Sequence, residues 1–488
     1  MTIFTKALGT LNGINKPNLN PLLLLFAVFT VFMLPGRAKS QNTTYKVRTG
    51  IYAGTAGELP FWFYSNINGK IDPSGTNFLN ELSFHHLFMD NGTLLLSGGV
   101  NTVLRFSDDK SVHLSELYIQ ARAYGLQLDA GRFRQPIGLN NHQLSVGSMM
   151  VSDNAIPIPK ISISTPEFME VPFTDGFLQY KGMFSHGWLE GSRYVSNAFL
   201  HQKYFYLRVN AGSFSGTGGI IHNAQWGGES PQFGRLPQSF GDYLRLISGM
   251  GANPESNAPG GEISNVMGNS VAAYEFGLAY RHDQYRISVT RLFYLEDKVS
   301  TRFRSPWDGV WGANLTFDNN NGLLHAITYE HINTKNQDAK SWELIGRRDY
   351  YDNFVYRSGW TYENRTLGIP LILFDGTTIT NNVLIGHHVG FKGKGTDNLA
   401  YRILFTYSRN YGVRDDWVSR GGDSIPNDRD DIIPREQFRQ DQYSWLVQFK
   451  YTLQNLEGLQ VDLSIGSDTG KLYANNLGVM AGVSYTGW

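Results

Sequence analysis

The chain has no cysteine among its 488 residues, carries 42 basic and 42 acidic side chains, and contains few long apolar runs. The lack of cysteine excludes a disulfide scaffold and a lipoprotein anchored through cysteine. A net charge of zero gives no indication of a nucleic-acid partner. No apolar run reaches the 18 residues that a membrane-spanning helix needs, which excludes a helical membrane bundle. A membrane β-barrel remains compatible with this composition, because its strands are only half apolar.

Residues 1–40 have the pattern of a secretory signal peptide. Lys6 and Lys16 precede an apolar run over residues 22–34, and Ala38 and Ser40 occupy the small-residue positions of a cleavage site. An uncleaved anchor is the alternative, but the run is too short to span a bilayer as a helix. We therefore expect an exported mature chain, residues 41–488, that is periplasmic, extracellular or in the outer membrane.

The dominant sequence period in this chain is two. The stretches "YSWLVQFKYTL" (443–453), "LQVDLSIG" (459–466) and "LGVMAGVSY" (477–485) alternate apolar and small or polar residues, as half-buried strands do. A soluble β-sandwich is the alternative. Strands of about ten residues with aromatics near their ends favour a barrel. We count about 17 to 19 candidate strands, which predicts an all-β fold: a transmembrane antiparallel β-barrel of about 18 strands.

Three long segments interrupt the strand pattern. Residues 135–173 include the stretch 153–173, whose four prolines cannot donate to a strand ladder. Residues 222–268 are rich in Gly, Pro, Asn and Ser and include "FGDYLRLISGM", whose spacing predicts a short amphipathic helix. Residues 410–440 form a charged loop, expected on the extracellular side. We expect residues 135–173 to fold into or across the barrel and narrow it; a flexible surface loop is the alternative.

The sequence shows no enzyme motif. G-x-S-x-G, H-E-x-x-H, phosphate-loop and EF-hand patterns are all missing. His387 and His388 are adjacent, so on a strand they face opposite sides and make a poor chelate. We therefore expect no catalytic residue, cofactor or metal, although a Ser–His barrel hydrolase with distant partners stays open. A calcium site is disfavoured because its candidate ligands match no known spacing: Asp423, Asp428, Asp430 and Asp431.

Two groups of residues are candidates for binding. In the 410–440 loop an indole ring lies among charged side chains, and sugars combine apolar faces that stack on such rings with hydroxyls that charged groups can bind. A solvated loop with one Trp at the lipid interface is the alternative. The glycan-contact candidates are Arg414, Asp415, Asp416, Trp417 and Arg420. The candidates for the polar wall of the lumen are Arg193, His201, Lys203 and Arg208.

Several strings, in order, resemble the Wzi-type capsule-assembly outer-membrane proteins in their Bacteroidetes-like form. The resemblance implies an 18-stranded barrel with helical and irregular segments in its lumen or at its periplasmic side. It also implies a non-catalytic, lectin-like role in holding capsular polysaccharide at the cell surface. The strings are "SDNAIPIPKISI" (152–163), "SRYVSNAFLHQKYFYLRV" (192–209), "IHNAQWGG" (221–228), "PQSFGDYLRLISG" (237–249), "RDYYDNFVYRSGWTYENRTLGIPL" (348–371) and "YRILFTYSRNYG" (401–412).

These observations predict a non-enzymatic glycan-binding barrel in the outer membrane. The expected partners are capsular or other surface polysaccharide, outer-membrane lipids and, during insertion, the barrel-assembly machinery, with no nucleic acid. A substrate-selective porin or export channel is the alternative. The two differ in that a porin needs a continuous wet pore.

Overall fold

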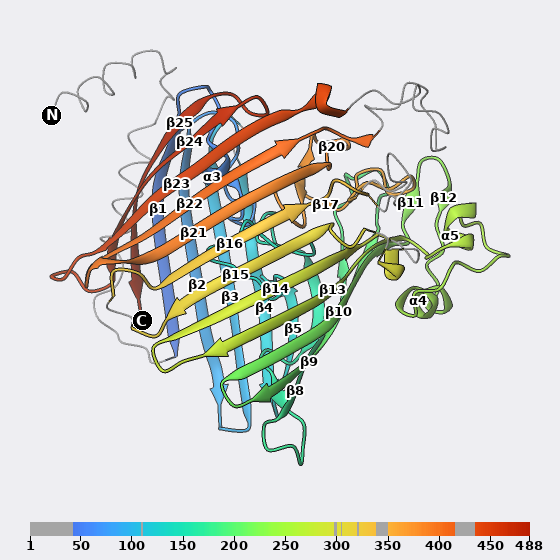
Figure 1. Cartoon of the computed structure of the whole chain (residues 1–488), viewed down its shortest axis with the longest axis horizontal. Coiled ribbons are helices and arrows are strands. Elements are labelled where there is room, and N and C mark those ends of the chain that lie inside the picture. The colour runs from blue at the N-terminus through green and yellow to red at the C-terminus, as the bar shows by residue number, and fades with distance from the viewer. Residues whose placement is uncertain are drawn as a thin grey trace.

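The computed structural model describes residues 42–108, 111–296, 300–303, 305–319, 322–337, 350–414 and 435–488. Its main feature is one antiparallel sheet that closes on itself (Figure 1). The predicted signal peptide at residues 1–40 lies outside the described residues. The sheet is built from β1 (Thr43–Gly54), β2 (Asn77–Asp90), β3 (Leu94–Phe106), β4 (Ser111–Ala123), β5 (Leu126–Arg132), β6 (Pro159–Ser164), β7 (Met169–Glu170), β8 (Leu178–Trp188), β9 (Phe199–Ala211), β10 (Phe214–Trp226), β13 (Asn269–Arg281), β14 (Tyr285–Leu295), β15 (Gly309–Phe317), β16 (Ala326–Asn333), β21 (Leu384–Thr396), β22 (Leu399–Asn410), β23 (Gln440–Thr452), β24 (Leu459–Gly470) and β25 (Asn476–Gly487).

Strand pairing closes this sheet into a barrel of 18 positions. Each strand pairs with its neighbour, and β1 completes the ring by pairing with both β2 and β25. The short strands β6 and β7 share one position, because both pair with β8. The predicted fold class, an antiparallel barrel of about 18 strands, is therefore confirmed.

The two faces of the barrel strands differ in polarity. On β24, Leu463 and Ile465 are about half exposed on the outside, whereas Asp462 and Ser464 are buried on the inside. The same alternation continues around the ring, because side chains along a strand point to opposite faces. The barrel thus presents an apolar outer band and a polar inner wall, as membrane barrels do.

The two ends of the barrel carry different connections. Tyr45 pairs with Gly487, so the first and last strands meet at one end, which we call the terminal end. The opposite end, the loop end, carries the long connections. Short turns on one side and long loops on the other are typical of outer-membrane barrels. Connections at the terminal end include 124–125, 212–213 and 397–398, and those at the loop end include 55–76, 133–158, 227–268, 334–383 and 411–439.

The long irregular segments have different boundaries from those expected. Within the predicted insertion 135–173, the chain returns to the barrel wall at β6, which starts with Pro159. Proline is tolerated as the first residue of a strand. Within the predicted insertion 222–268, β10 continues to Trp226, and β13 follows at Asn269.

In the part of the chain that the structure describes, few residues form helices or sheets outside the barrel wall. Among the described residues, no helix has the length and apolar character needed to cross a bilayer. The helices are α3 (Phe61–Tyr64), α4 (Phe240–Ile247), α5 (Gly260–Ser264) and the 3-10 turns η2 (Ser300–Arg302) and η5 (Arg435–Phe438). The short strand pairs are β11 (Glu229–Ser230) with β12 (Gly234–Arg235), β17 (Thr361–Tyr362) with β18 (Arg365–Thr366), and β19 (Leu373–Phe374) with β20 (Ile379–Asn381).

Helix α4 confirms the helix expected from "FGDYLRLISGM", but it lies outside the barrel wall rather than in the lumen (Figure 1). It begins with a capping box, in which Ser239 and Asp242 exchange side-chain and backbone hydrogen bonds. Leu246 packs with Trp226 and Ala224, whose side chains lie on the outward face of β10. The 227–268 excursion therefore covers part of the outer surface of the barrel near its loop end.

Candidate functional site

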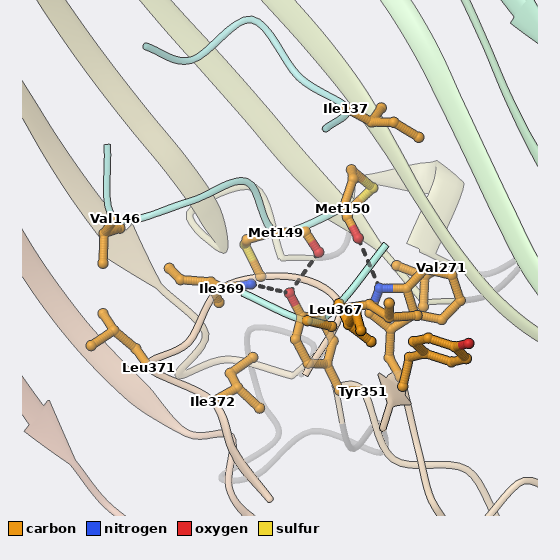
Figure 2. Packing of buried hydrophobic residues seen from close by; sticks show 14 of the residues in the cluster. Ile137, Val146, Met149, Met150, Val271, Tyr351, Leu367, Ile369, Leu371 and Ile372 are labelled. Atoms are coloured by element: carbon orange, nitrogen blue, oxygen red, sulfur yellow. Dashed lines mark hydrogen bonds between the residues drawn. The ribbon is translucent and has the colours of Figure 1, made fainter. Parts of the chain in front are cut away.

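The lumen is occupied by three segments from the loop end, residues 55–76, 133–158 and 350–383, which we call the plug. Together they contribute most of the large apolar side chains in the main buried cluster. Figure 2 shows part of this packing, with residues from 133–158 lying against residues from 350–383. The plug is therefore a packed apolar core inside the barrel.

Side-chain hydrogen bonds join the plug segments to one another. Tyr351 Oη donates to the carbonyl oxygen of Met149 at 2.6 Å and accepts from the Ile369 N–H at 3.1 Å. Trp360 Nε1 donates to the carbonyl oxygen of Met150 at 2.8 Å. These bonds satisfy carbonyls that no strand ladder reaches, which irregular buried backbone requires.

Carboxylates on the inner wall also hold the plug backbone. Glu330 on β16 accepts from Ser145 Oγ at 2.6 Å and from the Val146 N–H at 2.8 Å. On β13, Glu275 accepts from the Leu139 N–H at 2.9 Å. Because β13 and β16 lie far around the ring from β5 and β6, the 133–158 segment crosses the lumen. The expected crossing of the barrel by residues 135–173 therefore holds for the part before Pro159, whereas β6 and β7 belong to the wall.

The adjacent histidines on β21 face opposite sides, as their positions on a strand predict. His388 points inward, where its Nε2 lies 2.6 Å from the Leu144 carbonyl oxygen of the plug. His387 points outward and lies 2.9 Å from Tyr329 Oη. Within the described ranges, no group of three or more His, Asp or Glu residues is arranged to hold a metal ion.

Two of the four expected lumen residues lie on the inner side. Arg208 is on the inward row of β9, and its Nε donates to Thr217 Oγ1 at 3.1 Å. Arg193 lies in the 189–198 loop and is buried. Its guanidinium donates to the carbonyl oxygens of Thr361 at 3.0 Å and Gly359 at 3.1 Å. Arg193 therefore fastens the plug to a neighbouring loop.

The other two expected lumen residues, His201 and Lys203, lie on the outward row of β9, which corrects their expected position. Residues 205, 207 and 209 of the same row are exposed apolar side chains. His201 Nδ1 lies 3.2 Å from Tyr243 Oη of α4, and Lys203 Nζ donates to the carbonyl oxygen of Ile247 at the end of that helix. These polar groups are tolerated on the outer face because α4 covers them and supplies partners.

The charged 410–440 loop starts and ends at the loop end of the barrel. Arg414, at its start, is buried. The remaining glycan-contact candidates and the disfavoured calcium ligands fall at positions 415–434, outside the described residues. They are Asp415, Asp416, Trp417 and Arg420, and Asp423, Asp428, Asp430 and Asp431.

A cluster of aromatic and polar side chains lies at the loop end, and sequence reasoning had not selected it. Arg357 Cζ lies 5.0 Å from the centre of the Tyr194 ring and 5.7 Å from that of Phe354. Its Nη2 donates to Gln232 Oε1 at 2.7 Å. Phe233 adds a third ring, 5.9 Å from that of Phe354. We call these five residues the mouth cluster.

The mouth cluster has the chemistry that carbohydrate recognition needs. Phe354 is 60% exposed and Arg357 is exposed, so one ring face and one cation reach solvent. The ring offers a stacking surface for sugar C–H groups, while Arg357 and Gln232 offer hydrogen bonds to hydroxyls. The available sequence signal was the string "RDYYDNFVYRSGW", in which Phe354 and Arg357 are three residues apart. Tyr194 and Gln232 lie too far away in sequence to be associated with it.

A closed 18-stranded barrel with an apolar outer band, long loops at one end and a filled lumen defines an outer-membrane β-barrel with an internal plug. The family model described as capsule assembly protein Wzi matches residues 46–371. The chain belongs to this family, and the match ends in the plug, before the last five barrel strands. No curated protein matches the chain.

Solved structures are similar to this chain at low sequence identity. One is Wzi of Escherichia coli, described as an outer-membrane protein involved in group 1 capsule assembly and as a carbohydrate-binding β-barrel. It has 12% identity and a TM-score of 0.57, with 90% of this chain and 83% of that chain covered. Another is OpdL of Pseudomonas aeruginosa, with 11% identity and a TM-score of 0.47, covering 91% of this chain and 98% of that one.

Proposed function

We propose that this protein is a non-enzymatic outer-membrane barrel that holds capsular polysaccharide at the cell surface. The observation that carries the proposal is the plug. Three segments occupy the lumen and are joined to one another and to the barrel wall by hydrogen bonds and packing. A blocked lumen suits a surface anchor better than a diffusion channel. Membership of the capsule assembly family and the fold shared with a carbohydrate-binding barrel support the same function.

The loop end is the side we assign to the cell exterior. Long loops face outward and short turns face the periplasm in bacterial outer-membrane barrels. The mouth cluster then faces the polysaccharide. The other candidates for glycan contact stay those of the 410–440 loop, Asp415, Asp416, Trp417 and Arg420, whereas Arg414 at its start is buried. Aromatic rings beside charged side chains give contacts that many sugar residues of one polymer can occupy in turn.

Deletion of the gene tests this function. We expect the cells to go on producing polysaccharide but to release it into the medium, measured as the polymer in the cell and medium fractions. Complementation with the double variant Phe354→Ala/Arg357→Gln is expected to restore retention only partly. The matched control is Phe173→Ala/Arg281→Gln, which removes an exposed phenylalanine and an exposed arginine at the terminal end.

Two results would contradict the proposal. Polysaccharide that stays on the deleted cells in normal amount would remove the anchoring role and favour a substrate-selective porin or export channel. Hydrolysis of polysaccharide, phospholipid or peptide by the purified protein would contradict the non-enzymatic assignment.

A further inference from the structure

A cavity of about 520 Å³ lies inside the barrel, between the plug and the terminal end. Its volume falls within the range of small-molecule binding sites. Residues 46 of β1, 392 of β21 and 450 of β23 line it, and all three lie near the turns of the terminal end. Trp62 and Phe63 of the plug close the opposite side and are buried. The cavity is therefore far from the mouth cluster.

The lining of this cavity is strongly basic. The two carboxylates in it are each paired. Lys70 Nζ lies 2.5 Å from Glu81 Oε1, and Arg48 Nε lies 3.6 Å from Asp462 Oδ2. The remaining cations of the lining make no ion pair with any described carboxylate, which leaves an excess of four positive charges. They are Lys46, Lys392, Arg402 and Lys450.

Neutral groups of the plug accept hydrogen bonds from two of these cations, but they do not neutralise the positive charge. Lys392 Nζ donates to Gln143 Oε1 at 2.6 Å, and Arg402 Nη1 donates to the Gln143 carbonyl oxygen at 3.2 Å. Arg402 Nε is buried and has no hydrogen-bond partner among the described residues. Like charges gathered within low-dielectric walls attract an anion more strongly than the same charges in water.

Groups suited to hydroxyls lie beside these cations. Trp62 Nε1, Ser464 Oγ and Asp462 Oδ1 are buried and have no hydrogen-bond partner among the described residues. They offer an N–H donor, a hydroxyl and a carboxylate acceptor within the lining of one cavity. A sugar ring carries several hydroxyls that can both donate to and accept from these three groups, which a simple inorganic anion such as chloride cannot do.

We propose that this cavity binds an anionic sugar, a hexose ring that bears a carboxylate or a phosphate. The anion pairs with Lys46, Lys450 and Arg402, and the ring hydroxyls pair with Trp62 and Ser464. Acidic residues of a polysaccharide and the phosphorylated sugars of membrane lipids both carry this chemistry. The inference does not depend on the proposed function, because the cavity and the mouth cluster lie at opposite ends of the barrel.

Calorimetric titration of the purified full chain in detergent micelles tests the proposal. The probes are digalacturonic acid, glucose 1-phosphate, inorganic phosphate and the neutral disaccharide maltose. We expect one or both anionic sugars to bind at least tenfold more tightly than maltose and inorganic phosphate, and more weakly as salt increases. Tighter binding of digalacturonic acid identifies acidic polysaccharide as the source; tighter binding of glucose 1-phosphate identifies phosphorylated lipid sugars.

Variants locate the binding. Lys46→Gln/Lys450→Gln is expected to weaken binding of the anionic sugar about tenfold, because each lost cation removes a charge-assisted hydrogen bond. Lys450→Arg keeps the charge and is expected to keep the affinity. The control Lys471→Gln removes an exposed lysine at the loop end and is expected to change nothing.

Three results would overturn the proposal. One is equal affinity for maltose and the anionic sugars, and another is equal affinity for inorganic phosphate and glucose 1-phosphate, which would indicate an ion site only. The third is unchanged affinity in Lys46→Gln/Lys450→Gln when the variant shows the heat-modifiable electrophoretic mobility of a folded barrel.

Discussion

Glu330 illustrates how the barrel wall holds an irregular chain. The plug backbone lacks a strand ladder, so its buried N–H groups need side-chain acceptors. Glu330 and Glu275 supply two of them, and Asp468 on β24 supplies a third to the Phe61 N–H at 2.8 Å. The acceptors lie on strands spread around the ring, and they fix the plug segments 55–76 and 133–158 to the barrel wall.

The first prediction concerns Glu330. Glu330→Ala leaves Ser145 Oγ and the Val146 N–H buried without an acceptor, at a cost of about 1–3 kcal/mol for each unsatisfied group. We expect faster amide hydrogen exchange at residues 144–148 than in the unchanged protein. The control Glu457→Ala removes an exposed carboxylate from a terminal-end turn. Equal exchange in Glu330→Ala and the unchanged protein would show that Glu330 does not hold the plug.

A second prediction at the residue scale is a pH dependence in α5. Burial raises the pKa of Glu262 to about 7, above its ordinary value of 4.5. The protonated form is thus favoured in the fold, and this contribution to stability is complete below about pH 4.5 and is lost as the pH rises through 7. The loss amounts to roughly 3 kcal/mol.

The measurement for Glu262 is limited proteolysis of the 227–268 excursion at pH 5.5 and pH 8. We expect faster cleavage at pH 8, after correction for the protease's own pH dependence. Glu262→Gln, which cannot ionise, is expected to remove the difference. A difference that persists in Glu262→Gln would assign the pH effect to another group.

At the scale of elements, α4 shows what local sequence determines and what it leaves open. The spacing in "FGDYLRLISGM" and the capping box are local, so they predicted the helix. The surface against which it packs depends on Trp226 and Ala224 of β10, which sequence periodicity does not connect to it. Phe240, Leu244 and Met250 remain exposed. For the same reason the outward position of His201 and Lys203 was missed.

The third prediction concerns the start of α4. Ser239→Ala removes the side chain that accepts from the Asp242 N–H, and an N-cap of this kind contributes about 1 kcal/mol. We expect faster hydrogen exchange over residues 240–247 and no change in the barrel strands. Ser264→Ala is the control, since this exposed hydroxyl lies at the end of α5. Unchanged exchange at α4 would show that its packing on β10 alone determines its stability.

The strands themselves were predictable because an outward apolar band and an inward polar wall impose a period of two on each of them. Strand β6 was the exception. It is short, it follows an irregular segment, and Pro159 at its start obscured the pattern. The contents of the plug were less predictable, since contacts such as Tyr351 with Met149 join residues about 200 positions apart.

At the scale of the whole molecule, the 18-stranded ring is wide enough for an open channel, and the plug is what fills it. The fourth prediction is therefore low conductance of the unchanged protein in planar bilayers. Replacing residues 139–150 with a short Gly-Ser linker removes the part of the plug that crosses to β13 and β16, and a large stable conductance is expected. A shortened terminal-end turn at 171–176 is the control. High conductance before any deletion would show that ions pass around the plug.

The seam between β1 and β25 sets the order in which the molecule can be made. On one side, the first strand has no partner until the twelve residues of β25 have been synthesised and exported, and an unpaired strand edge is prone to aggregate. The plug segments arise early and late in the chain, at 55–76 and 350–383, and Arg365 binds the carbonyl oxygen of Ile71 across them at 2.7 Å. Internal packing and ring closure must therefore be timed together, and assembly has to protect an open, half-filled cylinder from the moment β1 appears until β25 arrives.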